Sequence, residues 1–468
     1  MKKILVFIVV VLIGYFGSVA FVGSKSEEHH EKYINQVNKI YQKHGIELKS
    51  KLIKKSFFTA KYELSMDYTN ENMKKIIAEF YTLPMVFEYD VEFGPLLFRN
   101  GFGLGYAGFY SKKSLNSVLA KDLSTGIFKG KETNLVTKGR ITFSDKLICD
   151  VFMDEININI MGAVNVKVAE SSLVSKTDIK TLLGSGTVNI PSVELTDLTN
   201  PAKKVTIENI DLHANIKEFI ETTLLGDFVL DIEKVSLAGN EFQFQPRVEV
   251  GMNENEKGLL DINAKLVYKN LKGQLSPIKV NNANISMALN KLDKSSLLVL
   301  STYFKEVQNK QLALFDKMSN KDANITLIYQ EIEALNSEIA GKIMPLIKNV
   351  LVLNKTNLKI DANINKENKL DFKADYIADG IPNRIDDFEY ELPTVLANSF
   401  KAEVSLEVIK SIAGLLRVPS EQLAYYISEG FIEDLGDVYT TKANYEPVKL
   451  VVNSRDKTAL VSPFVIIE

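Results

Sequence analysis

The chain has 468 residues, enough for about three domain-sized units. Its 46% apolar and 25% charged residues are typical of a globular protein and exclude a disordered chain. With 56 basic residues against 59 acidic ones, the net charge of −3 provides no general footprint for nucleic acid or for polybasic binding to lipid. One cysteine excludes an internal disulfide framework, four histidines leave little for a metal cage, and there is no tryptophan.

An uncharged apolar stretch near the N-terminus predicts a signal anchor. It runs from Ile4 to Val22, directly after Lys2 and Lys3. Its 19 residues would form a helix about 28 Å long, close to the ~30 Å hydrocarbon core of a bilayer. We therefore expect residues 1–23 to form a transmembrane helix in the inner membrane, with Ile4 and Val22 as its ends. The positive-inside rule keeps the N-terminus in the cytoplasm and the bulk of the chain in the periplasm.

A cleaved signal peptide is the alternative interpretation of the same stretch. Ser18-Val19-Ala20 supplies the small residues of a cleavage site. Cleavage there would leave a secreted or periplasmic protein. Phe21 and Val22 extend the apolar run beyond that site, which favours the anchor.

Residues 24–45 are predicted to form a stalk helix that continues from the membrane segment. Apolar side chains recur at helical spacing between Tyr33 and Tyr41. His29 and His30 are adjacent, so they point about 100° apart on a helix and no further metal ligand is at hand. We interpret this pair as part of a solvated face.

Residues 46–292 are predicted to form a strand-rich body. Apolar and polar residues alternate in runs such as 58–68, and Gly- and Asn-containing turns separate the runs. Glu88, Asp90 and Glu92 lie on one face of a strand. Alternate side chains of a strand are about 7 Å apart, so we favour a solvated face over a calcium site.

A helical pair is predicted at residues 293–350, followed by a C-terminal α+β portion at residues 351–468. The helices are expected at 294–319 and 323–347, with Pro345 near the second end. The list of further expected elements comprises strands at 357–365, 370–376 and 400–406, helices at 407–416 and 420–435, and a hairpin over 439–452. The fold class is thus α+β: an N-terminal transmembrane helix, then a large, mainly antiparallel sheet with helices packed on it. No linker separates the parts, so we expect one shared sheet.

Some motifs resemble catalytic or cofactor sites, but the residues around them do not fit the structure that such sites require. The run Gly103 to Gly108 matches G-x-G-x-x-G, but it alternates like a strand with one small face, where another element packs closely. Ser276 and Lys279 have S-x-x-K spacing without the partner motifs of penicillin-recognising enzymes. Cys149 lies in a strand-like run and His213 stands alone in another, so we expect a buried thiol and an outward imidazole. We predict no cofactor, no metal site and no catalytic residues.

One modification motif stands out. Asn324-Ile325-Thr326 is a glycosylation sequon, and Asp322 precedes the asparagine by two residues. An acidic residue at that position resembles the sequon of bacterial N-glycosylation systems. The motif falls at a predicted turn between the two long helices. We therefore retain Asn324 as a candidate N-glycosylation site.

Several short motifs occur in a characteristic order. After the Lys-flanked apolar stretch come Lys55-Ser56-Phe57-Phe58, Gly94-Pro95-Leu96, Leu346-Ile347-Lys348-Asn349 and Lys401-Ala402-Glu403-Val404-Ser405-Leu406. Over nearly its whole length the chain resembles the YdgA-like family of bacterial envelope proteins, whose function is largely unassigned. The resemblance implies an inner-membrane anchor and a periplasmic domain, and it supplies no catalytic residues. Family members often have histidine before Gly-Pro, whereas Phe93 stands here, so no role of that histidine carries over.

The function expected from these features is a non-enzymatic, membrane-anchored scaffold or interaction module of the cell envelope. Its partner would be a second copy or another envelope protein. A lipid- or apolar-ligand-binding protein, by analogy with AsmA-like proteins, is the alternative, and a hydrolase is disfavoured. A sheet with one apolar face must cover that face with helices, a partner or a ligand. An open apolar face would therefore favour lipid, and a face covered by the chain's own helices would favour a scaffold.

Overall fold

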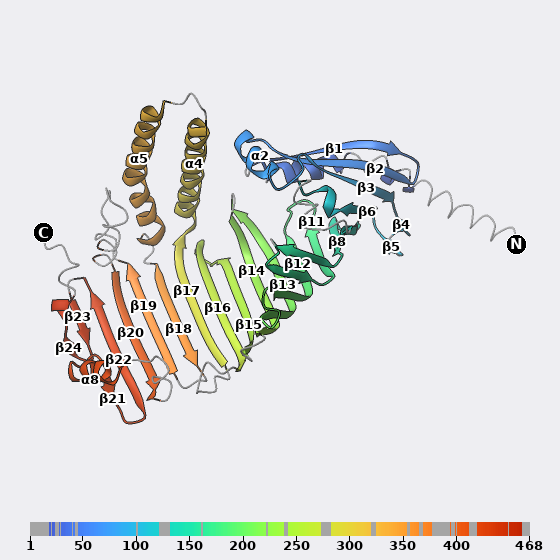
Figure 1. The fold of residues 1–468 in the computed structure, drawn as a ribbon. Helices are drawn as coiled ribbons and strands as arrows, with labels where there is room; N and C mark the ends of the chain where they lie inside the picture. The colour runs from blue at the N-terminus through green and yellow to red at the C-terminus, as the bar shows by residue number, and fades with distance from the viewer. Residues whose placement is uncertain are drawn as a thin grey trace. The chain divides into compact units, whose positions relative to one another are not determined.

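The computed structural model describes most of the chain in two units, Met1–Gly239 and Asn240–Glu468 (Figure 1). The boundary falls inside the predicted strand-rich body. The described residues are 18–19, 21–23, 28, 30–39, 41–42, 45–99, 102–120, 132–160, 162–220, 223–237, 242–272, 282–319, 324–352, 356–364, 368–376, 394, 398, 400–410, 419–447 and 449–460.

The first unit is built on an antiparallel sheet in which β1, β2, β3, β6, β7, β8, β11, β12, β13 and β14 are successive neighbours. Its strands are β1 (Ile46–Lys55), β2 (Thr59–Tyr68), β3 (Met85–Phe93), β6 (Ala107–Ser114), β7 (Asn134–Ile141), β8 (Lys146–Met153), β9 (Ile156–Ile160), β10 (Val164–Val168), β11 (Ser171–Asp178), β12 (Gly184–Asp197), β13 (Lys204–Ile220) and β14 (Thr223–Leu237). The β9–β10 hairpin joins β12 beside β11. Helix α2 (Glu71–Ala78), the turn η2 (Leu115–Ser117) and the small hairpin of β4 (Leu96–Leu97) and β5 (Gly103–Leu104) complete the unit. The antiparallel pairing and the strand predicted at 58–68 are confirmed.

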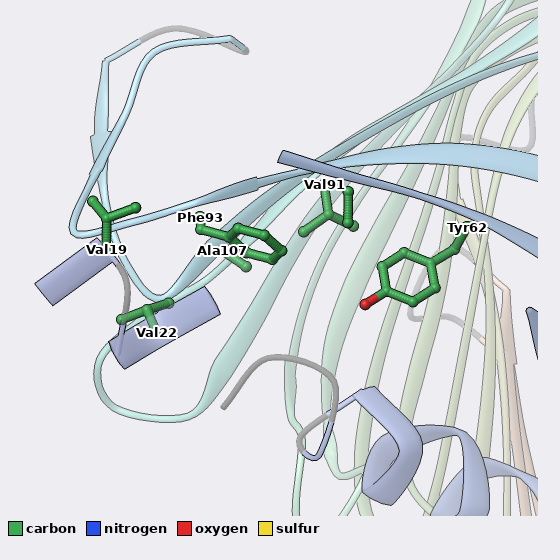
Figure 2. Close-up of a cluster of buried hydrophobic side chains, with 7 residues drawn as sticks. Val19, Val22, Tyr62, Val91, Phe93 and Ala107 are labelled. Carbon is green, nitrogen blue, oxygen red and sulfur yellow. The ribbon is translucent and has the colours of Figure 1, made fainter. Parts of the chain in front are cut away.

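The N-terminal residues form the core of this unit together with the sheet (Figure 2). Val19 and Val22, both in helical backbone, pack against Phe93 and Ala107. Phe93 is only 1% exposed and Val19 is fully buried. The alternation of β2 and β3 directs apolar side chains to this side of the sheet, and the cluster also contains Ala60, Tyr62 and Val91. The end of the predicted anchor therefore lies within the protein core.

The residues predicted as a stalk lie against the sheet. Residues 28, 30–39 and 41 are helical. The Asn38 side chain donates from Nδ2 to the Leu48 carbonyl at 2.7 Å and accepts the Leu48 N–H at 2.8 Å. Because β1 is an edge strand of the described sheet, the Leu48 N–H and carbonyl have no partner strand on this side, and the Asn38 amide provides their hydrogen bonds.

In three neighbouring strands of the first unit, the alternation of apolar and polar residues is interrupted at paired positions. There, two successive apolar residues are three positions apart instead of two. The apolar residues beside the change are Ile190 and Val193 in β12, Ile207 and Ile210 in β13, and Ile232 and Val235 in β14. At that level β12 has Pro191, and β13 has Asn209 with a φ of +49°, a conformation that asparagine tolerates. The Asn209 amide also bonds the Glu233 carboxylate of β14. Pro191 lies opposite the gap between β10 and β11. Proline has no backbone N–H, and at this gap neither neighbouring strand loses a hydrogen bond through its absence.

The second unit is also an antiparallel sheet, in the order β15, β16, β17, β18, β19, β20, β22, β23, β24. The strands are β15 (Phe242–Glu254), β16 (Leu259–Lys272), β17 (Asn282–Asp293), β18 (Asn357–Ile364), β19 (Asn368–Tyr376), β20 (Phe400–Ile409), β21 (Glu433–Asp434), β22 (Val438–Glu446), β23 (Lys449–Val452) and β24 (Arg455–Asp456), with β21 paired to β22. Helices α4 (Lys294–Ser319) and α5 (Ile325–Val352) lie between β17 and β18, and α8 (Ser420–Ser428) and the turn η5 (Thr458–Leu460) follow. Because β18 pairs with β17, the C-terminal portion continues the sheet of β15 to β17.

The helical pair forms where the sequence predicts it, with one difference. Helix α4 has the predicted bounds, but α5 passes through Pro345 and continues to Val352. Ion pairs Lys310–Glu338 at 2.6 Å and Lys317–Glu331 at 2.5 Å join the two helices. The pair stands at the edge of the sheet where β17 ends (Figure 1). Within the described part of the chain, no helix combines the length and the apolar character needed to cross a membrane.

Two predicted helices near the C-terminus are wrong in extent. Strand β20 runs to Ile409, into the predicted helix 407–416, and residues 411–418 lie outside the described ones. Helix α8 ends at Ser428 instead of 435. Gly430, with a φ of +78°, supplies the left-handed residue that ends a helix, so β21 follows within the predicted helical range.

We expect the Phe93→Ala variant of the full-length chain to lower the free energy of unfolding of the first unit by about 3–5 kcal/mol, because it leaves a cavity in the core. Phe102→Ala is the matched control, since Phe102 is 73% exposed, and it should change stability by less than about 0.5 kcal/mol. Pulse proteolysis in urea measures both. Equal losses in the two variants would contradict the placement of the N-terminal residues on Phe93.

Candidate functional site

The second unit has one continuous apolar sheet face. The strand registers place Ala264 of β16, Met287 of β17 and Ile360 of β18 in one row. Through β19 the same row reaches Val404 of β20. The neighbouring positions on this face are Val248, Val250 and Met252 in β15, Ile262 and Leu266 in β16, Ile285 and Leu289 in β17, Leu358 in β18 and Leu406 in β20. Alternate residues of a strand point to the same face of the sheet, and in each of these strands the alternate residues on this side are apolar.

The middle of this apolar face is open among the described residues. Ile285 is 43% and Met287 42% exposed, although both lie in a central strand. Helices α4 and α5 contact β17 near its end, where Leu292 is buried. The opposite face is charged, with ion pairs such as Lys359–Asp361 at 3.2 Å. The exposed side chains therefore belong to an apolar surface backed by a solvated one.

A small polar cleft lies on the other side of the first unit's sheet from the core. Its volume is about 240 Å³, and it is lined by Glu92, Leu97, Phe102, Gly103, Gly108, Lys138, Gly139, Arg140, Ile148 and Asp150. The β4–β5 hairpin borders it. Glu92 accepts the backbone N–H groups of Phe98 at 3.0 Å and of Arg99 at 2.9 Å, and Arg99 pairs with Asp90 at 3.0 Å. The acidic strand face that we predicted to be solvated thus holds the loop after β3 in place.

Lys138 and Arg140 are the two cations of this cleft, and the sequence singled out neither. A side chain at Gly103 would place its Cβ only 2.6 Å from Arg140 Nη1, so the glycine makes room for the guanidinium. The register also places Lys138 of β7 opposite Asp150 of β8. Two cations and two carboxylates are thus close together, yet the cleft has no nucleophile with a general base beside it. The signal in the sequence was the Lys-Gly-Arg alternation of residues 138–140.

The G-x-G-x-x-G run forms strand and turn, as its alternation predicts. Gly103 belongs to β5 and Gly108 to β6. A Cβ on Gly105 would lie 2.4 Å from the Ile141 carbonyl oxygen, so β7 packs closely there. The run is therefore no strand-to-helix turn of the kind that holds a dinucleotide.

His30 is half-buried against the sheet of the first unit, and its prediction as a solvated residue is wrong. Its ring stacks on Tyr62 with centroids 4.4 Å apart and bonds the Tyr89 hydroxyl, while Ser50 Oγ lies 3.5 Å from Nε2. Burial lowers the pKa of His30 to about 4 and raises the pKa of Tyr89 to about 12. The helix packs this side of itself on β2 and β3, which helical periodicity alone does not reveal. His29 lies outside the described residues.

The remaining predicted positions are dispersed. Asn324 is exposed at the start of α5, where its Oδ1 accepts the Leu327 N–H at 3.2 Å and caps the helix. Its modification stays a prediction. Cys149 is a half-buried free thiol, and burial raises its pKa to about 11, which makes it a poor nucleophile. His213 is exposed, as predicted, and bonds Thr187 at 3.0 Å.

Val22, one expected end of the membrane stretch, is 8% exposed in the core of the first unit. Ile4, the other end, lies outside the described residues, as do Ser276 and Lys279. Among the described residues, no group of three or more His, Cys, Asp and Glu side chains is placed to hold a metal ion.

Comparison with known proteins finds one family. A family model described as "Bacterial protein of unknown function (DUF945)" matches residues 1–457. No curated protein and no solved structure matches the chain at a significant level.

We expect the full-length chain to lose up to about 3 kcal/mol of unfolding free energy between pH 6.5 and pH 4 through His30. The folded state holds the imidazole neutral between Tyr62 and Tyr89, so the unfolded state binds more protons in this window. The free energy of unfolding therefore decreases as the pH is lowered. His30→Phe should flatten the slope, because phenylalanine keeps the stacking and does not titrate. Urea unfolding at several pH values measures this. An unchanged slope in His30→Phe would rule out His30 as the source.

Proposed function

The chain belongs to the DUF945 family of bacterial proteins of unknown function, and we propose that it is a non-enzymatic envelope protein that binds the acyl chains of lipids on the apolar sheet face of its second unit. The observation that carries this proposal is the exposure of Ile285 and Met287 in the middle of that face. Exposed apolar patches of this kind mark binding surfaces. Single exposed residues would need no such explanation, but these two belong to neighbouring rows that are apolar in each strand from β15 to β20.

The size of the apolar face suits one acyl chain. From β16 to β20 there are four gaps between strands, which add up to about 19 Å. An acyl chain spans about half of the ~30 Å hydrocarbon core. A chain laid across the strands would therefore contact about four of these five strands. The charged opposite face restricts such binding to one side of the sheet.

The proposed location is the inner membrane, with the bulk of the chain in the periplasm. The uncharged stretch from Ile4 and the preceding Lys2 and Lys3 support it. The motif order that resembles YdgA-like proteins supports the same location.

We expect Met287→Lys to reduce bound phospholipid about tenfold, because it places a charge in the middle of the apolar face. Met287 is already 42% exposed, so the substitution should leave the fold intact. The matched control is Ser286→Lys, the neighbouring residue of β17 on the charged face, where Asp361 lies opposite. Both full-length proteins are purified in mild detergent, and the lipid that copurifies is extracted and measured by mass spectrometry.

Lipid-free wild-type protein would refute the acyl-chain proposal. Equal lipid in the two lysine variants would place any bound lipid elsewhere on the chain.

A scaffold is the second candidate, favoured by the helical pair. Apolar side chains are exposed along both helices: Val299, Phe304 and Met318 in α4, and Ile325, Leu327 and Tyr329 in α5. Ile325 and Tyr329 are four residues apart and so share one helix face. Their neighbours Ile328 and Leu335 are buried. A helix with a second apolar side suits a protein partner, such as a second copy or another envelope protein.

We expect a photo-crosslinking residue at position 329 to trap one dominant protein partner in cells if the scaffold role holds. The control position is Tyr425 of α8, which is 57% exposed compared with 58% for Tyr329. Denaturing gels compare the crosslinked products. The same product pattern at both positions, or monomer alone at position 329, would count against the scaffold.

A further inference from the structure

Three turns of the first unit meet at one end of its sheet. The Phe93 N–H bonds the Phe58 carbonyl at 2.8 Å, which ties the end of β3 to the β1–β2 turn. The Gly94 N–H bonds the Tyr106 carbonyl at 2.7 Å, and the Tyr106 N–H bonds the Ile141 carbonyl at 2.8 Å. These bonds connect the loop between β3 and β6 to the end of β7. The β1–β2 turn, the β3–β6 loop and the β7–β8 turn therefore form one surface.

Large apolar side chains are exposed on all three of these turns. The aromatic end, as we name it, comprises Phe57 and Phe58 of the first turn, Phe98, Phe102 and Leu104 of the loop, and Phe143 of the third turn. Phe102 is 73% and Phe98 59% exposed, and their ring centroids are 5.9 Å apart. Leu52 and Ile53 of β1 extend the exposed apolar surface from the first turn. Phenylalanine in turns has no structural need to face water, so this concentration indicates a contact surface.

The N-terminal apolar stretch reaches the protein at this same end. Val19 and Val22 pack on Phe93 and Ala107, the last residue of β3 and the first of β6. Figure 2 shows both valines beside Phe93 and Ala107. Phe21 lies between them in sequence and is 62% exposed. Ser18, the residue bonded to Val19, therefore lies at the same end of the sheet as the aromatic end.

The charge around the aromatic end fits a membrane surface. From Leu48 to Tyr62 the chain has five lysines and no acidic residue. Lys49 pairs with Glu47, and Lys61 pairs with Glu88. Lys51 and Lys54 are exposed on β1 beside the aromatic end. Lysines next to exposed aromatic side chains are typical of segments that contact anionic headgroups.

We infer that the aromatic end inserts into the headgroup–acyl boundary of the bilayer that the N-terminal stretch enters. Its Phe side chains bury their rings at that boundary, and the lysines of β1 face the headgroups. This surface holds the first unit against the membrane at a defined orientation in addition to the covalent anchor. The inference rests on the proposed membrane location and is independent of acyl-chain binding by the second unit.

The lack of tryptophan makes this surface directly testable. Phe102→Trp and, as a second probe, Phe98→Trp are made in the full-length chain and reconstituted into vesicles of phosphatidylcholine and phosphatidylglycerol with brominated acyl chains. Tyr425→Trp, on an exposed side chain of α8 in the second unit, is the matched control. We expect bromine to quench either loop tryptophan at least about twofold more than the control, with blue-shifted emission, because the ring lies among acyl chains.

The outcomes separate this inference from the proposal on which it rests. If the wild-type chain floats with the vesicles but the loop tryptophans are quenched no more than Tyr425→Trp, the aromatic end does not contact the bilayer and the inference fails alone. If the wild-type chain does not float with the vesicles, the membrane location and the inference fail together. Quenching of both loop tryptophans and not of the control supports the inference.

Discussion

The structure depends on one constraint: nearly every strand has one apolar face, and that face must be shielded from water. In the first unit the N-terminal residues shield part of it, because Val19, Val22 and the helix that carries His30 pack on β2, β3 and β6, whereas Leu212 of β13 is 39% exposed. In the second unit α4 and α5 stand at the end of β17. There, Met287 and its neighbours remain open among the described residues. Each unit thus covers only part of its apolar face, and the open part in the second unit is the one to which we assign a ligand.

The end of the apolar N-terminal stretch shows how burial in protein and in lipid compete for the same residues. Val19 and Val22 satisfy the criterion for a membrane segment, yet they lie in a protein core beside Phe93. Transfer from water to either environment is favourable for a valine, so hydropathy does not distinguish them. What distinguishes them is the set of apolar partners that β3 and β6 supply. Phe21, which lies between them in sequence, is exposed, so one short segment has a side in the core and a side at the surface.

Polar residues at close-packed positions were the least predictable part of the chain. His30 looked like a solvated residue of a helix and is stacked on Tyr62. Arg140 drew no attention in the sequence, although a Cβ at Gly103 would come within 2.6 Å of its Nη1. Helix α5 was expected to end at residue 347, near Pro345, and instead continues to Val352. For His30 and Arg140 the deciding contact comes from a residue far away in the sequence, and periodicity carries no information about it.

The sequence by itself determined the local structure of this protein: the alternating strands, the two long helices with α4 at its predicted bounds, and the turn chemistry that separates them. These features follow from interactions within a few residues, which spacing and turn residues report directly. Only the tertiary structure decided that the predicted stalk lies on the sheet, that the alternation changes phase at Pro191 and Asn209, and which apolar face stays open. Each of these depends on which distant segment packs against a given face. An apolar side chain is attracted equally to any apolar neighbour, so that choice is made by the packing of the whole unit.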